Sequence, residues 1–193
     1  RTNIEEEKLS GGARLSWLFD NNRYIKNLFF QSAYVNSTLK YDFDGTFVDT
    51  TYNIENLQLL VYYGASYRKA KKNIYPKWSF TVQGRFFSNL KHKQTSMMGK
   101  VTTTLPGLFN NHGLKISYSD QRSNSVFVPN YISESRGYLN HFYKDAQKMS
   151  FDYALPLLYP DFKVGKLAYV QRIRMSTFYD YMKINDGLES SEL

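Results

Sequence analysis

The chain has 193 residues, with 25 Lys and Arg against 17 Asp and Glu and a net charge of +8. This length can hold one sizeable core, and an aromatic content of 17% excludes a disordered chain. The absence of cysteine excludes disulfide frameworks, zinc–thiolate sites and cysteine nucleophiles. No apolar run approaches the roughly 18–20 residues that a membrane-spanning helix needs.

Alternation of apolar and polar residues with a period of two recurs along the chain and predicts about eight β-strands. The clearest case runs from Trp78 to Phe86, where even positions are apolar or glycine and odd positions are polar. Turn signals such as Asp20-Asn21-Asn22 lie between the strands. In chain order, the expected strands cover 13–20, 26–38, 57–68, 78–86, 96–105, 115–119, 148–158 and 167–182.

Alternation alone fits both a membrane barrel and a soluble β-sandwich, but strand length favours the barrel. A tilted strand that crosses a bilayer needs roughly 9–11 residues, whereas soluble strands typically have about 5–6. Segments 57–68, 148–158 and 167–182 belong to the longer class. We therefore predict an all-β chain that forms a transmembrane antiparallel β-barrel, with 1–193 as a single domain or part of one.

The side chains on the two faces of the expected strands also suit a barrel. Large polar groups such as Arg85 and Lys100 fall on the polar faces, as expected for a water-filled lumen. Tyrosine and phenylalanine gather near strand ends, where aromatic girdles mark the membrane interfaces. We assign to these girdles Tyr62-Tyr63, Phe86-Phe87 and Tyr179 with Tyr181.

Residues 122–147 lack clear periodicity and are expected to form a long loop. Loops beyond about 12–15 residues are uncommon in compact domains and are usually functional or disordered. This loop contains Arg136-Gly137-Tyr138. We expect it to fold into the lumen.

Two carboxylates are predicted to face this loop. By parity, Asp152 and Asp180 lie on the polar faces of their strands, so both should point into the lumen. An arginine brought there by the loop can pair with both through its planar guanidinium, and Gly137 lets the backbone turn tightly beside it. The sequence therefore predicts that Arg136 anchors the loop.

Three segments resemble, in order and in spacing, motifs of the outer-membrane assembly and two-partner-secretion barrel superfamily, also called bacterial surface antigens. In that family, a loop with an Arg-Gly-Phe/Tyr motif folds back into the lumen. The resemblance covers 122–182 by motif, and Leu155 to Asp161 is also similar to barrels that follow TolB-like propeller domains. The segments are Arg136-Gly137-Tyr138, Phe151-Asp152-Tyr153 with Pro156, and Phe178-Tyr179-Asp180.

The chain departs from the family pattern at three positions. Ser135 stands where the family has Val or Ile, and Asp152 stands where it usually has Glu. The glycine that usually follows the aspartate of the last motif is absent, because Tyr181 follows Asp180.

The resemblance implies that the chain is a piece of a 16-stranded barrel in a Gram-negative-type bacterial outer membrane. Such barrels insert or translocate client polypeptides and work with other outer-membrane or periplasmic proteins. Two alternatives stay open. One is a complete eight-stranded barrel that serves as an anchor, a channel or a docking subunit. The other is a soluble β-sandwich binding module.

The basic residues are expected to meet lipid rather than nucleic acid. The densest runs, 68–72 and 91–93, fall at expected strand ends or loops. A barrel meets the polar headgroups of the bilayer there, so these runs suit water or anionic lipid headgroups. Nucleic-acid binding would instead favour basic clusters with aromatic stacking platforms.

No arrangement of residues predicts an enzyme, a cofactor site or a metal site. None of His92, His112 and His141 has another histidine three or four residues away, and the chain has no cysteine. No phosphate loop, dinucleotide fingerprint or Gly-x-Ser-x-Gly elbow is present. A glycosidase-like pair of Asp152 and Asp180 can be imagined, but an arginine anchor accounts for both with fewer assumptions. We expect no catalytic, cofactor-binding or metal-binding residues.

Overall fold

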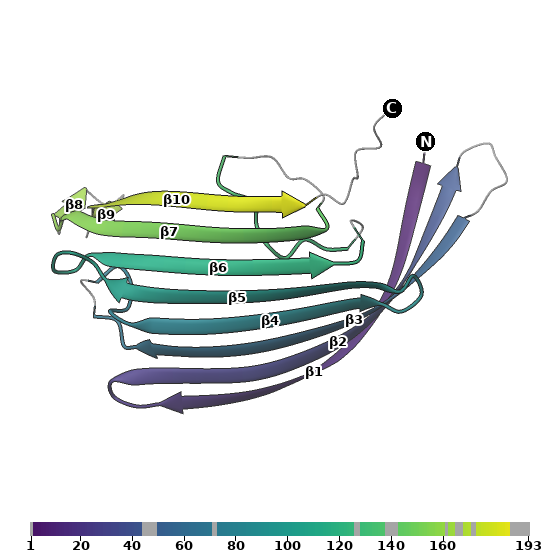
Figure 1. The fold of residues 1–193 in the computed structure, drawn as a ribbon, viewed down its shortest axis with the longest axis horizontal. Helices are drawn as coiled ribbons and strands as arrows, with labels where there is room; N and C mark the ends of the chain where they lie inside the picture. Colours follow the sequence, from purple (N-terminus) through teal and green to yellow (C-terminus); the bar gives the residue numbers. More distant parts are fainter. Residues whose placement is uncertain are drawn as a thin grey trace.

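A single large antiparallel sheet makes up most of the structure (Figure 1). The computed structural model describes residues 2–43, 50–70, 73–125, 128–137, 143–160, 162–164, 168–170 and 173–185. The predicted all-β class is confirmed, with no helix among these residues. In the same part of the chain, therefore, no helix is long and apolar enough to cross a membrane.

Eight strands form the main sheet, in the order β1-β2-β3-β4-β5-β6-β7-β10. Each of them pairs antiparallel with its neighbour in this order. They are β1 (Thr2–Asp20), β2 (Tyr24–Phe43), β3 (Thr50–Tyr67), β4 (Ser79–Asn89), β5 (Gln94–Pro106), β6 (Gly113–Ser123), β7 (Asp145–Leu158) and β10 (Ile173–Asn185). A separate two-stranded sheet consists of β8 (Phe162–Val164) and β9 (Ala168–Val170).

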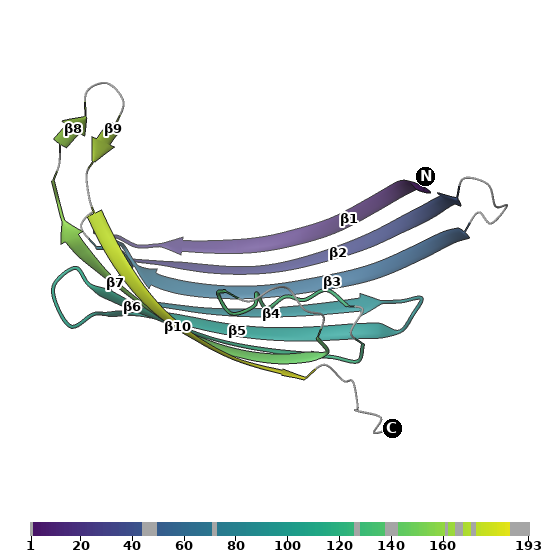
Figure 2. The ribbon, with the colours of Figure 1, turned by 90° about the horizontal axis from the view of Figure 1, so that it is seen from above.

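The sheet is curved like part of a barrel wall, but it is not closed (Figures 1 and 2). No pairing joins β1 to β10 among the described residues, so these two strands form open edges. These eight strands therefore do not by themselves make the complete small barrel that was one alternative. The described strands also show no second large sheet packed on the first, as a β-sandwich would require.

The prediction of one strand over 167–182 is wrong. The structure instead has the short β9 and then β10, whose pairing with β7 shifts register between Ile173 and Arg174. Alternation continues through both segments, which is why the sequence pattern did not reveal the division. The long connection is close to its expected place: β6 ends at Ser123 and β7 begins at Asp145.

One face of the sheet, called here the outer face, carries a continuous row of large apolar side chains. The eight members of this apolar row stand directly opposite one another from β1 to β10. Seven of them are exposed, and Leu28 is partly exposed. The row consists of Trp17, Leu28, Tyr63, Val82, Val101, Tyr118, Met149 and Tyr181.

The next residues along the same strands form a row of opposite character on the inner face. This polar row is small or polar in seven of the eight strands, and Leu18 in the edge strand β1 is the exception. The seven are Asn27, Gly64, Thr81, Thr102, Ser117, Ser150 and Asp180. Because successive side chains of a strand point to opposite faces, the two rows show directly that the faces differ in polarity.

The connection between β6 and β7 covers part of the inner face, around which the sheet curves (Figure 2). Ile132 and Tyr143 from this connection pack against Met98 of β5 and Ala146 of β7. All four are nearly inaccessible to solvent. The best-buried apolar cluster thus lies between a loop and a sheet, and not between two sheets.

The inner face is not purely polar, and two of the predicted girdle residues lie on it. Tyr62 stacks on Phe29 with ring centroids 4.9 Å apart, and the Arg14 guanidinium lies 4.1 Å from the Phe29 ring centroid. Phe87 is also buried on this face. Neighbouring residues of a strand point to opposite faces, so only one of each pair Tyr62-Tyr63 and Phe86-Phe87 can lie on the outer face.

Candidate functional site

Arg136 ties the β6–β7 connection to two neighbouring strands. Its Nε and one terminal nitrogen donate to the two carboxylate oxygens of Asp180 in β10, both at 2.9 Å. The other terminal nitrogen donates to Asp152 in β7 at 2.7 Å. The Arg136 backbone N–H donates to Asp180 as well, at 3.1 Å. The structure thus brings together the three charged residues that the sequence singled out.

The two carboxylates are far less accessible than the arginine that binds them. The Asp180 side chain is 5% exposed and that of Asp152 is 18% exposed, against 42% for Arg136. The hydrogen bonds to Asp180 raise the pKa of the Arg136 guanidinium above its usual value, so the side chain stays charged at any pH of interest. The Arg136 guanidinium also lies over the ring of Phe178, with its carbon 3.6 Å from the ring centroid, which is a cation–π contact.

Lys148 in β7 extends this ion-pair network. Its Nζ donates to the backbone carbonyls of Ser133 and Glu134 at 3.0 and 2.7 Å, and lies 3.8 Å from an Asp180 oxygen. The Lys148 side chain is only 11% exposed. Since Asp152, Asp180, Arg136 and Lys148 carry two charges of each sign, the cluster is formally neutral.

Gly137 has the backbone conformation that the sequence predicted for a tight turn. Its φ is +95°, a value that residues with a Cβ rarely adopt. An added Cβ would meet no atom within 4 Å. A side chain at this position would therefore lower stability through backbone strain and not through a steric clash.

The substitution Gly137→Ala is therefore expected to lower the free energy of unfolding by about 1 kcal/mol. A urea titration of the folded chain in detergent micelles would measure this loss. Gly11→Ala is the matched control, because no atom lies within 4 Å of the added Cβ there and no positive φ is involved. Equal stability of the two variants would show that the turn at Gly137 does not depend on glycine.

Further contacts hold the connection ahead of Arg136. Gln121 of β6, fully buried, accepts a hydrogen bond from the Tyr131 N–H at 2.8 Å and donates to the Pro129 carbonyl at 3.4 Å. The Tyr143 hydroxyl donates to the Ile132 carbonyl. Burial, followed by the nearby Glu134 charge, raises the pKa of Tyr143 to about 12, so this hydroxyl remains a donor at neutral pH. The loop is therefore fixed at several points.

Two residues of this cluster were not predicted, although the sequence held a signal for both. Lys148 shares the parity of Asp152, and Phe178 shares that of Asp180, so each pair lies on one face of its strand. The contacts of Gln121 and Tyr143 had no such signal, because they depend on how the loop folds back. Tyr138, the last residue of the predicted motif, lies outside the described residues.

The cluster holds the β6–β7 connection to both β7 and β10, and the arginine engages both carboxylates. No group of three potential metal ligands occurs in the described part of the chain. Of the histidines, His112 hydrogen-bonds the Tyr153 hydroxyl at 2.8 Å, His92 lies in the β4–β5 turn, and His141 is outside the described residues.

The site is thus defined by its own geometry: an arginine in a loop, two carboxylates on adjacent strands, and a lysine that completes the charge balance. Comparisons of the chain with protein-family models and with curated proteins found no match in either case.

Proposed function

We propose that this chain is a transmembrane β-barrel segment of a bacterial outer membrane, in which Arg136 holds the β6–β7 connection inside the lumen. The observation that carries the proposal is the pair of rows on the sheet. The apolar row runs along the outer face across all eight strands and is exposed in seven of them, and the polar row lies on the inner face. A soluble sheet would cover its apolar face, whereas a barrel in lipid turns that face outward.

The loop anchor fits this orientation. Charged side chains are costly in lipid, and the Arg136 cluster gathers four of them on the inner face, which also carries Arg85 and Lys100. Removing this connection would expose Met98 and Ala146 of the sheet. The loop therefore acts as a plug-like element that fills part of the enclosed space.

The proposed activity is insertion or translocation of client polypeptides, as in the superfamily that the chain resembles. In that superfamily, a weakly closed seam between the first and last strands can accept an incoming strand through backbone hydrogen bonds. Closure of the barrel then requires further strands. A barrel that serves only as an anchor, channel or docking subunit is the second candidate.

Transfer of the full chain from denaturant into three media tests the membrane assignment. We expect folding, seen as a β-sheet circular dichroism spectrum and a single species by size exclusion, in detergent micelles and in phosphatidylcholine vesicles. In plain buffer the exposed outer face should cause aggregation. A folded monomer in plain buffer would overturn the assignment.

Depletion of the protein in its source bacterium tests the activity separately. We expect the amounts of other β-barrel proteins in the outer membrane to fall, while lipoproteins stay unchanged. Wild-type protein should restore them, and the Arg136→Ala variant should not. Unchanged amounts of other barrels, with this chain itself inserted, would instead support the anchor, channel or docking role.

A further inference from the structure

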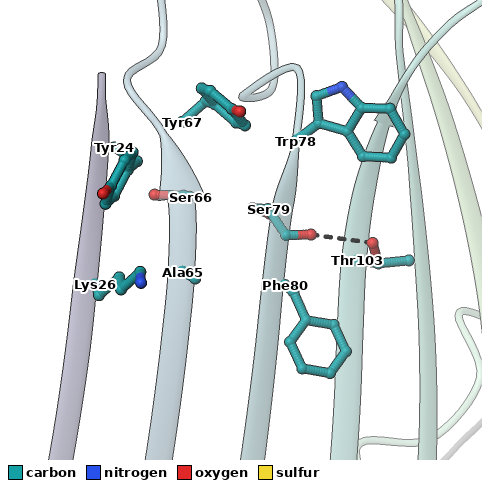
Figure 3. A pocket seen from close by; sticks show the side chains of 9 residues that line it. All are labelled: Tyr24, Lys26, Ala65, Ser66, Tyr67, Trp78, Ser79, Phe80 and Thr103. Carbon is teal, nitrogen blue, oxygen red and sulfur yellow. Dashed lines mark hydrogen bonds between the residues drawn. The ribbon is translucent and has the colours of Figure 1, made fainter.

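An open groove of about 370 Å³ lies on the outer face, near the ends of β2, β3 and β4 (Figure 3). Aromatic rings surround it: Tyr24, Tyr67 and Trp78 lie toward the strand ends, and Phe80 lies further along β4. All four side chains are exposed. Such a ring of aromatic side chains at the strand ends is typical of the level at which a membrane protein meets lipid headgroups.

The backbone on both sides of the groove is well tied. The Tyr67 N–H donates to the Trp78 carbonyl at 2.9 Å, which joins β3 to the residue preceding β4. The Thr103 hydroxyl donates to the Ser79 carbonyl at 3.0 Å, which joins β5 to β4. The groove is therefore a feature of the sheet and not of a loose loop.

Lys26 brings a positive charge into this apolar groove. Its Nζ lies 5.3 Å from the Tyr24 ring centroid, and no acidic side chain lines the groove. The nearby carboxylate of Asp20 is bound through both of its oxygens by Arg68, at 2.7 Å each. Further cations stand at the same strand ends, where Arg23, Lys69 and Lys77 are exposed.

We propose that this groove binds one anionic phospholipid, with its phosphate at Lys26 and an acyl chain along Phe80. The inference rests on the membrane orientation proposed above and adds a specific lipid class and position. Lys26 stands level with Ala65 and Phe80 across the sheet, and its Nζ lies close to the Tyr24 ring at the strand end. The groove thus offers one cation beside apolar and aromatic side chains, which complements such a lipid in both polarity and charge. A zwitterionic lipid, in contrast, offers no net charge to Lys26, and a basic residue near a membrane surface favours anionic lipid by about fivefold.

Tryptophan fluorescence can report on this groove, because the chain has only two tryptophans and Trp78 lines it. The variant Trp17→Phe leaves Trp78 as the single reporter. A control with Trp17→Phe, Trp78→Phe and Tyr118→Trp places the reporter in the middle of the outer face, on β6. Each full-length protein is reconstituted into phosphatidylcholine vesicles that contain either dibrominated phosphatidylglycerol or dibrominated phosphatidylcholine, whose bromines quench tryptophan on contact.

We expect the two brominated lipids to quench the tryptophan at position 118 equally. At Trp78, quenching should show that the groove binds phosphatidylglycerol about fivefold more tightly than phosphatidylcholine. Lys26→Gln should abolish this preference, while Lys77→Gln, outside the groove lining, should keep it. Equal quenching by the two lipids at Trp78, or loss of the preference in Lys77→Gln as well, would overturn the groove site. Absence of quenching at 118 would instead overturn the membrane orientation itself.

Discussion

Replacing Val82 with arginine should lower the free energy of unfolding of the vesicle-inserted protein by about 2–4 kcal/mol, the cost of a cation on the lipid face near the middle of a bilayer. Val82 belongs to the apolar row and stands opposite Tyr63 and Val101 in the central part of the sheet. A urea titration of the vesicle-inserted protein measures the loss. The substitution tests directly whether the outer face meets hydrocarbon.

Thr81→Arg is the matched control for this experiment. Thr81 is the preceding residue of the same strand, lies in the polar row, and stands opposite Gly64 and Thr102. We expect this variant to lose less than about 1 kcal/mol, because lumen positions tolerate charge. Equal losses at the two positions would contradict the lipid-facing assignment, as would a Val82→Arg variant that stays fully stable.

The substitution Arg136→Ala should lower the free energy of unfolding by about 2–4 kcal/mol. The Asp180 carboxylate and the partly buried Asp152 carboxylate would lose their main partner and face one another. Breaking a fully buried pair costs roughly 3–5 kcal/mol, and solvent access to Arg136 reduces this figure. We also expect the connection 124–144 to become sensitive to chymotrypsin, which is preferable to trypsin because it does not cleave after arginine.

Two further variants make the Arg136 result specific. Arg122→Ala removes an exposed arginine that pairs only locally, with Asp120, and should change stability by less than about 1 kcal/mol. Adding Asp152→Asn and Asp180→Asn to Arg136→Ala should restore part of the stability, because it removes the unpaired charges. Wild-type stability and protease resistance of Arg136→Ala would show that the arginine is not an anchor.

Much of the fold could be predicted because strand alternation is a local property of the sequence. Positions 78–86 alternate so regularly that both the strand and the orientation of its faces followed from them. The same parity placed Asp152 and Asp180 on one face of the sheet. Parity also shows why the assignment of Tyr62 and Phe87 to the girdles was wrong, since each is adjacent to an outer-face residue.

The division of 167–182 into β9 and β10 could not be predicted in the same way. Alternation reports the direction of side chains but not the partner strand to which a segment is hydrogen-bonded. The register shift at Ile173 and Arg174 is a property of the pairing with β7. The open edges at β1 and β10 likewise concern pairing and leave no mark on the periodicity of either strand.

The sequence by itself determined that the chain is all-β, which side chains share a face, and which arginine and carboxylates were candidates for an anchor. These follow from the period of two, which is set by the backbone of each strand alone. Only the tertiary structure decided that the 128–137 segment folds onto the inner face and that Arg136 reaches both carboxylates at once. It also decided that Lys148 completes the cluster and that aromatic residues from three strand ends line one groove with Lys26. These contacts join residues far apart in the chain, so they depend on strand register and loop path, which no local pattern encodes.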